Sequence, residues 1–283
     1  MYTLFISIAA GFISGLLAST TGMNWGWITF IGILVSIAIF ALMSRSKYKG
    51  LKAIMESIQK LQQQAHGEAN RLIHRAQSGQ GGNPKVVQKQ IETLMHNAAE
   101  NMIKELDKAE PYFPWLLMSE KQISTSKAQL YCQLKQFEKA DQYLAKSFVM
   151  DPLTACMLLA RAYKKKDDKL DKMYKKFISR FKKDKGLMVY ATYSWILFKQ
   201  EKYTEAQEIL ATAKEQVSNN EGIVNNWEAI VNNKYKQFSN HFIGEQWYAL
   251  HLEQPPQAKQ QRAGKGALKN NPMYGGKGKR RFG

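Results

Sequence analysis

Charged side chains are missing from the first 44 residues of this 283-residue chain. The whole chain has 41 Lys and Arg against 23 Asp and Glu, a formal net charge of +18, and all of these residues follow position 44. A soluble globular domain carries charge over its whole surface, so this absence excludes a simple soluble globule. Intrinsic disorder of the whole chain is also excluded, because 45% of the residues are hydrophobic and 11% are aromatic.

Cysteine is scarce, with Cys132 and Cys156 as the only two in the sequence. Two cysteines cannot supply the framework of bridges that holds small secreted domains together. We expect two buried free thiols, although a single bridge between them stays open.

The chain also lacks the short motifs of common catalytic sites. It has no GxxxxGK[ST] phosphate loop, no GxGxxG after a strand, no GxSxG and no metal-spaced set of Cys and His. His66 and His74 are about two helical turns apart, too far to share one metal ion. We therefore expect no metal, no cofactor and no enzymatic activity.

Two long apolar runs fill the charge-free region, at residues 2–19 and 24–43. Each is long enough for a membrane-spanning helix, which needs about 20 apolar residues. Aromatic residues typical of the membrane interface flank the runs: Tyr2, Trp25, Trp27 and Tyr48. The first run has no preceding Lys or Arg, unlike a cleaved signal peptide. We predict a transmembrane helical hairpin over residues 1–44.

A cluster of cations follows the second run and is absent from the short loop between the runs. Its members are Arg45, Lys47, Lys49 and Lys52. Positively charged flanks stay on the cytoplasmic side of a membrane, so we expect both the N-terminus and residues 45–283 to face the cytosol. A bacterial inner membrane is favoured by the simple hairpin and the reduced cysteines, and an organellar membrane stays open.

Small residues recur on one face of the first run: Ala10, Gly11, Ser14, Gly15 and Ala18. Small faces let helices approach closely. The favoured interpretation is packing against the second run of the same chain, with dimerisation as the alternative.

Residues 45–110 show apolar residues at steps of three and four, which indicates amphipathic helices. These residues are Leu51, Ile54, Met55, Ile58, Leu61, Ala65, Ala69, Leu72, Ala76, Val87, Ile91, Leu94, Ala98, Met102 and Leu106. Three glycines and Pro84 interrupt the pattern at residues 78–84. We predict an antiparallel hairpin or a short coiled coil that packs against the next domain. The aromatic turn at residues 110–115 marks the boundary of that domain.

Residues 121–152 and 187–218 place small and large residues where two closely packed antiparallel helices need them. Their turns, LKQFEKA and FKQEKYTEA, are close in sequence. A third unit begins between them but has Lys172 where a small residue is expected. The positions of the pattern are Ala128, Tyr131, Ala140, Leu144, Pro152, Ala160, Tyr163, Ser194, Leu197, Ala206, Leu210 and Ala213.

This pattern resembles the tetratricopeptide repeat (TPR), a 34-residue helix–turn–helix unit. Ser124 and Lys127 stand where the family usually has Trp and Leu. The resemblance implies a short α-solenoid over residues 111–253, in which residues 223–252 form a further helical pair or a cap. It also implies a concave groove that holds peptides or partner proteins and does not catalyse.

A strongly basic segment, residues 161–185, has 12 Lys and Arg against 4 Asp. It includes the run Lys164, Lys165 and Lys166. A solvated helix face explains such a segment. The alternative is contact with anionic headgroups, RNA or an acidic partner protein.

Acidic residues are absent from residues 254–283, which contain eight Lys and Arg. The most C-terminal cations are Lys277, Lys279, Arg280 and Arg281. This segment has too little apolar surface to repay its ordering entropy, so we predict a disordered tail. It suits RNA phosphates or anionic lipid, or it acts only to solubilise the chain.

The sequence as a whole predicts an all-α protein. Its N-terminal transmembrane hairpin leads into a helical hairpin, a TPR-like α-solenoid and a basic tail. The first functional hypothesis is an integral membrane protein whose cytosolic domain is a protein-binding scaffold. The alternative is a membrane-tethered receptor for RNA or the ribosome that acts through its tail. The partners expected are the lipid bilayer and a protein that the sequence does not identify.

Overall fold

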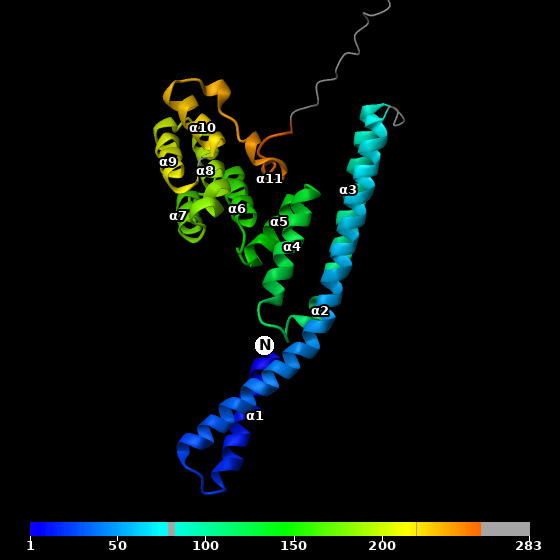
Figure 1. Cartoon of the computed structure of the whole chain (residues 1–283), viewed down its shortest axis with the longest axis vertical. Coiled ribbons are helices and arrows are strands. Elements are labelled where there is room, and N and C mark those ends of the chain that lie inside the picture. The colour runs from blue at the N-terminus through cyan, green and yellow to red at the C-terminus, as the bar shows by residue number, and fades with distance from the viewer. Residues whose placement is uncertain (79–82, 219, 256–283) are drawn as a thin grey trace, which may run out of the picture.

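A computed structural model describes residues 1–78, 83–218 and 220–255 (Figure 1). Within these ranges every regular element is a helix, so the predicted all-helical class is confirmed for them. A pair of apolar helices comes first, a long antiparallel pair continues from it, and a stack of shorter helices follows (Figure 1). Most of the predicted tail, from residue 256 onward, lies outside the described residues.

Helix α1 (Tyr2–Ser19) packs antiparallel to the first part of helix α2 (Trp25–Gln77). Both helices are long and apolar enough to cross a membrane. Their large side chains point away from the protein, and Phe12 and Leu42 are each 69% exposed. The core helices of soluble proteins bury such residues. These two helices therefore present an apolar surface that the described part of the chain leaves uncovered.

Helix α2 does not end at residue 44, where the sequence placed the end of the first segment. It runs on for 53 residues in all, so the second apolar run and the first juxtamembrane helix are one element. Proline is absent from residues 25–77, so nothing in the backbone forces a break. Gly50 lies within this helix and lets the Tyr112 ring pack directly on its backbone, because a Cβ there would overlap the ring.

Helices α1 and α2 cross closely at two glycines. A Cβ on Gly11 would lie 2.5 Å from the Gly32 carbonyl oxygen. Next to the crossing, the Ser36 hydroxyl donates a hydrogen bond of 2.8 Å to the Ser7 carbonyl. The small face of the first run thus packs against the second run of the same chain, as the favoured interpretation expected.

The start of α1 is fixed to the loop that precedes the helical stack. The Tyr2 backbone N–H donates to the Pro114 carbonyl at 2.7 Å, and the Thr3 hydroxyl donates to the Trp115 carbonyl. The Tyr2 and Trp115 rings meet edge to face with centroids 5.3 Å apart. The Lys47 ammonium of α2 lies 4.6 Å from the centre of the Trp115 ring. We call these five residues the junction.

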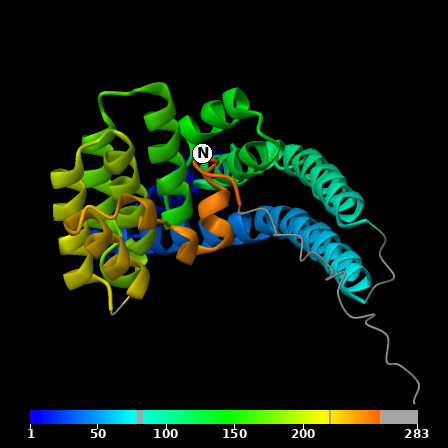
Figure 2. The same ribbon diagram turned by 90° about the horizontal axis from the view of Figure 1, so that it is seen from above.

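The second part of α2 pairs antiparallel with α3 (Pro84–Asp107), which supports the predicted hairpin (Figure 2). The short 3-10 helix η1 (Glu110–Tyr112) follows. Where this pair meets the stack, a small separate core contains Leu51, Leu106, Ala109, Leu116 and Ile123. The other end of the pair projects away from the stack (Figure 1).

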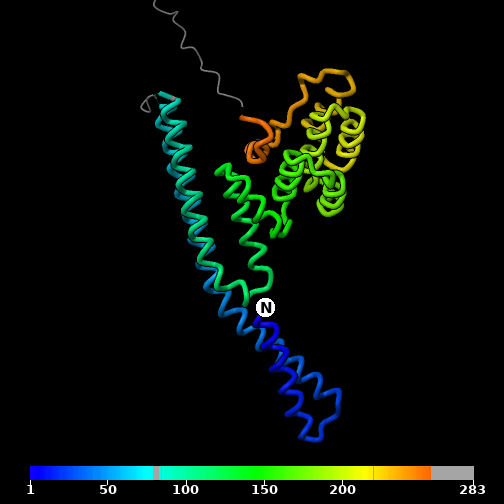
Figure 3. Tube along the Cα trace, turned by 180° about the vertical axis from the view of Figure 1, so that it is seen from behind, coloured from blue at the N-terminus to red at the C-terminus, as the bar shows by residue number. Residues whose placement is uncertain are grey.

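The helical stack comprises seven helices that alternate in direction (Figures 1 and 3). They are α4 (Ser119–Gln133), α5 (Phe137–Lys146), α6 (Pro152–Lys165), α7 (Leu170–Arg180), α8 (Leu187–Lys199), α9 (Tyr203–Gln216) and α10 (Glu221–Val231). The 3-10 helix η2 (Lys183–Gly186) precedes α8. Cys132 and Cys156 are buried free thiols in the core of the stack, as predicted. Burial raises the pKa of Cys132 to about 11 and that of Cys156 to about 12, so both stay protonated at neutral pH.

One kind of turn closes α4, α6, α8 and α10. Each has a non-glycine residue with φ between 55° and 62°: Lys135, Lys166, Glu201 and Asn233. In each turn this residue donates its N–H to the carbonyl three residues back, and the next residue donates to the carbonyl five residues back, at 2.7–3.1 Å. This is the Schellman arrangement, which satisfies the last carbonyls of a helix. The four residues are separated by 31, 35 and 32 positions, so the turn recurs at a nearly regular interval.

The turn between α6 and α7 is longer than its equivalents. Helices α5 and α9 begin two residues after the positive-φ residue, whereas α7 begins four residues after it. The fourth residue of α7 is consequently Met173, in the place that Ala140 and Ala206 take in α5 and α9. A small residue is absent there, and Lys172 is the preceding, exposed residue.

Substitution of the two glycines of α1 tests the close crossing. Gly11→Ala should lower the thermal midpoint of the detergent-solubilised protein, because overpacking costs about 1–3 kcal/mol. Gly15→Ala is the matched control, since its Cβ would meet nothing closer than 3.9 Å. Equal midpoints for the two variants would show that the crossing tolerates a side chain.

Glycine at the Schellman positions should stabilise the stack. Lys135→Gly and Glu201→Gly relieve an L-residue held at positive φ, so each should raise the free energy of unfolding by about 0.5–1 kcal/mol. Gln142→Gly, on the exposed side of α5, should lower it by about 1 kcal/mol. Urea unfolding followed by tryptophan fluorescence measures all three. Destabilisation by all three glycines would contradict the turn geometry.

Candidate functional site

The concave groove implied by the TPR resemblance would be lined by the first helix of each pair. The structure places the last described part of the chain across these helices (Figure 1). This part, residues 235–253, is called the C-terminal segment below. It contains η3 (Tyr235–Gln237), η4 (His241–Ile243) and the short helix α11 (Glu245–Tyr248).

A carboxylate and two indoles hold the centre of the C-terminal segment. Trp247 is completely buried, and its ring meets Trp195 of α8 with centroids 5.6 Å apart. One oxygen of Glu253 accepts from the Trp195 indole N–H at 2.7 Å, and the other accepts from the Trp247 indole N–H at 2.8 Å. Both buried indole donors are thereby satisfied.

Buried amides hold the beginning of the same segment. The Asn226 side chain on α10 donates to the Asn240 side chain at 2.8 Å, and Asn240 donates to the Ala191 carbonyl of α8 at 2.8 Å. The Ser239 backbone N–H donates to the Asn226 side-chain oxygen at 2.9 Å. Because both amides are buried, these bonds fix the path of the chain over α8 and α10.

The far end of the segment reaches the first helical pair. The His251 ring packs edge to face on Phe137, with centroids 5.4 Å apart. Burial lowers the pKa of His251, and the positive charges of Lys135 and Arg161 act in the same direction. The segment thus spans from α10 back to α4 and α5. The face that would hold a peptide in a TPR-like domain is covered by the chain itself.

A separate apolar cleft of about 450 Å³ lies between the long α2–α3 pair, α4, α6 and the C-terminal segment. Four methionines line it: Met55, Met95, Met102 and Met157. Amide side chains from α2 and α4 complete it: Gln62, Gln129 and Gln133. Methionine adapts its shape to irregular apolar surfaces. This methionine cleft can therefore accept apolar side chains of differing shape.

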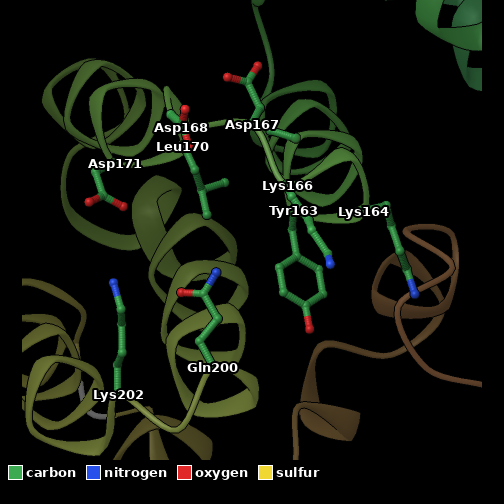
Figure 4. A pocket seen from close by; sticks show the side chains of 10 residues that line it. Tyr163, Lys164, Lys166, Asp167, Asp168, Leu170, Asp171, Gln200 and Lys202 are labelled. Atoms are coloured by element: carbon green, nitrogen blue, oxygen red, sulfur yellow. The ribbon is translucent and has the colours of Figure 1, made fainter.

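A polar cleft of about 710 Å³ lies at the turns after α6 and α8 (Figure 4). Lys164, Lys166 and Lys202 line it together with three carboxylates, Asp167, Asp168 and Asp171. Figure 4 shows Lys202 and Asp171 pointing into the same space from opposite sides. Charges of both signs are interspersed here, so this cleft does not present the uniform positive field that favours a polyanion.

Lys165, the middle residue of the predicted basic run, forms an ion pair within the protein. Its ammonium lies 2.8 Å from Asp141, which also accepts two hydrogen bonds of 2.8 Å from Arg161. Burial acts to raise the pKa of Asp141, but the two cations outweigh burial and lower it. The bidentate pair of Arg161 and Asp141 connects α5 to α6, and with Lys165 the three groups carry one net positive charge.

The predicted packing residues lie mostly inside the stack. The buried ones are Ala128, Ala140, Leu144, Ala160, Ser194, Leu197, Ala206, Leu210 and Ala213. Tyr131 and Tyr163 are partly buried beside them, and Pro152 begins α6. The shared turn aligns Ala162, one residue before Tyr163, with Tyr131. Four cations of the tail were also predicted to contact an anionic partner. They lie outside the described residues: Lys277, Lys279, Arg280 and Arg281.

Sequence reasoning did not find two features of this region. Lys127 looked like a departure from the repeat pattern, yet its side chain is buried with its ammonium 2.7 Å from Asp107 and 3.5 Å from Glu110. Burial acts to lower its pKa, but the hydrogen bond and charge of Asp107 outweigh burial and raise it. The second feature is the hydrogen bond between Glu253 and Trp195. Glu253 directly follows the predicted cap at residues 223–252, and no local pattern links it to a residue 58 positions earlier.

In the part of the chain that the structure describes, no group of three or more His, Cys, Asp or Glu is placed to hold a metal ion. Comparisons with protein-family models, with curated proteins and with solved structures find no match to this chain.

Loss of the Glu253 carboxylate should release the C-terminal segment. Glu253→Ala leaves two buried indole N–H groups without acceptors, which costs about 1–3 kcal/mol each. We expect hydrogen exchange over residues 244–252 to quicken by at least about thirtyfold. Glu228→Ala removes an exposed carboxylate from α10 and should leave that exchange unchanged. Unchanged exchange in Glu253→Ala would mean that the carboxylate is not needed and that the other contacts, such as the burial of Trp247, hold the segment.

Proposed function

We propose that this chain is an integral membrane protein whose cytosolic helical stack is a short TPR-like solenoid that binds a partner protein. The observation that carries the proposal is the junction. It joins an exposed apolar helical pair to a folded stack through hydrogen bonds and ring contacts at one place.

Membrane insertion is supported by the surface of α1 and α2. Apolar side chains face outward along both helices, and lipid would remove them from water. Trp25 and Trp27, 81% and 60% exposed, lie at the turn between the helices, where interfacial aromatic residues belong. The cations from Arg45 to Lys52 follow at the other end. We therefore place the stack in the cytosol, and we favour a bacterial inner membrane.

A binding role is supported by the recurring turn of the stack. The intervals of 31, 35 and 32 residues are close to the 34-residue TPR unit. Such stacks offer surfaces for proteins and peptides. The junction would hold the binding surface of the stack at a fixed distance from the bilayer, so that a bound partner would be held there too.

We assign the partner contact to the methionine cleft, because the C-terminal segment covers the groove that the resemblance would favour. The cleft is apolar with an amide rim, and its two walls come from the α2–α3 pair and from the stack. An amphipathic helix supplies the complementary surface, with apolar side chains toward the methionines and polar ones toward the glutamines.

A second candidate, the RNA or ribosome receptor, is supported by the charge of residues 254–283. Eight cations without one acid favour phosphates through counterion release. Glu253 would anchor the start of this tail on the stack. The two candidates differ in the part of the chain that contacts the partner.

Photocrosslinking in native membranes separates these candidates. A crosslinking amino acid at Gln62 or Gln133, which line the cleft, should give discrete protein adducts. The same amino acid at Gln142, exposed on α5 and outside the cleft, should give none.

Chain truncation after Glu253 completes the experiment. If the cleft adducts survive truncation and nuclease treatment, the scaffold function stands. If the adducts contain ribosomal proteins and vanish with the tail or with RNA, the receptor function replaces it. No adducts at either cleft position would refute binding at the cleft.

A further inference from the structure

The alternation of the helices divides the basic segment between the two ends of the stack. Helix α4 begins beside the junction, so the loops that follow the second helices lie at this same end (Figures 1 and 3). The loops that follow α5 and α7, residues 147–151 and 181–186, are called the hairpin-side loops below. The Schellman turns lie at the opposite end, with Lys166 as the positive-φ residue of one of them and Lys164 two residues before it.

Five exposed cations belong to the hairpin-side loops or directly precede them. They are Lys146, Arg180, Lys182, Lys183 and Lys185. Within the described residues none of them has a carboxylate partner within 4.0 Å. Their charges are therefore free to act on an external surface.

The acidic residues of these loops are engaged by the backbone. Asp184 accepts a hydrogen bond of 2.9 Å from the Ser218 N–H, and Asp151 caps α6 by accepting from the Thr154 N–H at 2.8 Å. Both carboxylates therefore have structural roles in holding the loops. The exposed cations still outnumber them by five to two.

Arg180 joins the two loops into one surface. Its guanidinium lies 5.0 Å from the centre of the Phe148 ring, and one of its nitrogens is 3.6 Å from the Met150 sulfur. Met150 is itself 64% exposed, and Leu117, in the loop before α4, is 61% exposed. Cations interspersed with exposed apolar side chains are typical of surfaces that rest in the headgroup region of a bilayer.

We propose that the hairpin-side loops bind the anionic headgroups of the same bilayer that α1 and α2 span. This proposal rests on the proposed membrane insertion, because the hairpin would bring that bilayer to this end of the stack. The anionic surface of a cytoplasmic leaflet attracts each nearby cation, and apolar side chains such as Met150 add burial at the interface. The junction and the loops would then hold the stack to the membrane at two separate places.

The opposite end of the stack supplies a matched control. Lys164, Lys166 and Lys169 are exposed there, beside Asp167 and Asp168. Replacement of these three lysines changes the net charge by the same amount as replacement of Lys182, Lys183 and Lys185. Any effect of total charge is therefore common to both triple variants.

The test uses full-length protein in nanodiscs of phosphatidylcholine, with or without phosphatidylglycerol. A fluorophore attached to Ser179→Cys, on the exposed last turn of α7, reports quenching by lipids with a nitroxide on the headgroup. The native thiols are buried and resist labelling. We expect strong quenching only in the anionic discs, with a decrease at high salt.

The triple variant K182Q/K183Q/K185Q should reduce the ratio of quenched to unquenched protein by about a hundredfold, because it removes three cations from the surface. The control K164Q/K166Q/K169Q should leave it unchanged. Equal quenching in neutral and anionic discs, or equal loss in both variants, would overturn the proposal. A response of the label to added RNA in place of anionic lipid would assign the surface to RNA and also overturn it.

A second label separates this proposal from membrane insertion itself. A fluorophore on Leu34→Cys should be quenched by nitroxides placed on the acyl chains. If Leu34 is quenched and Ser179 is not, insertion stands and the headgroup proposal fails. If Leu34 is not quenched, the proposed membrane function fails first.

Discussion

The contact of Tyr2 and Thr3 with the loop at Pro114 and Trp115 determines how the stack is placed relative to the apolar pair. Without it, the stack would be held to the apolar pair only indirectly, through the α2–α3 pair and the small core that contains Leu51, Leu106 and Ile123. The contact closes a ring of chain over more than 100 residues. Two residues of α2 strengthen this closure of the chain. Lys47 contacts the Trp115 side chain, and Gly50 leaves room for the Tyr112 side chain.

The stack shows how a repeat can be maintained while its sequence varies. Lysine, glutamate and asparagine all occupy the positive-φ position of the Schellman turns, although glycine suits that backbone best. Packing of the neighbouring helices fixes the conformation of each turn and offsets the free-energy cost of a non-glycine residue at positive φ. The longer turn after α6 changes this pair: Met173 takes the place of the small residue, and α6 and α7 contact each other less extensively than α4 and α5 or α8 and α9 do.

Periodicity in the sequence predicted the juxtamembrane hairpin, because its helices place apolar residues three or four positions apart. The long apolar runs predicted the apolar pair, and the repeated pattern of small and large residues predicted the buried residues of the stack. The continuity of α2 was not predicted, since a change in composition at residue 44 looks like a boundary although no backbone signal stops the helix. The four Schellman turns were not predicted, because lysine or glutamate at a position of positive φ cannot be recognised from composition. The one-residue shift between Tyr163 and Ala162 was missed for the same reason, since only the turn reveals the alignment. The Glu253 bridge was missed because it joins residues far apart in sequence, and only the fold brings them together.

Because α2 is one continuous helix, its two ends move together. Residues 45–77 of this helix extend for about 50 Å, at about 1.5 Å per residue. Helices adjust their tilt to the thickness of the bilayer that surrounds them. A change of about 10° in the tilt of the apolar part would move the far end of α2 sideways by about 9 Å, since no joint lies between them. If α1 and α2 span a bilayer as proposed, the position of the distal end of the α2–α3 pair would depend on the thickness of that bilayer.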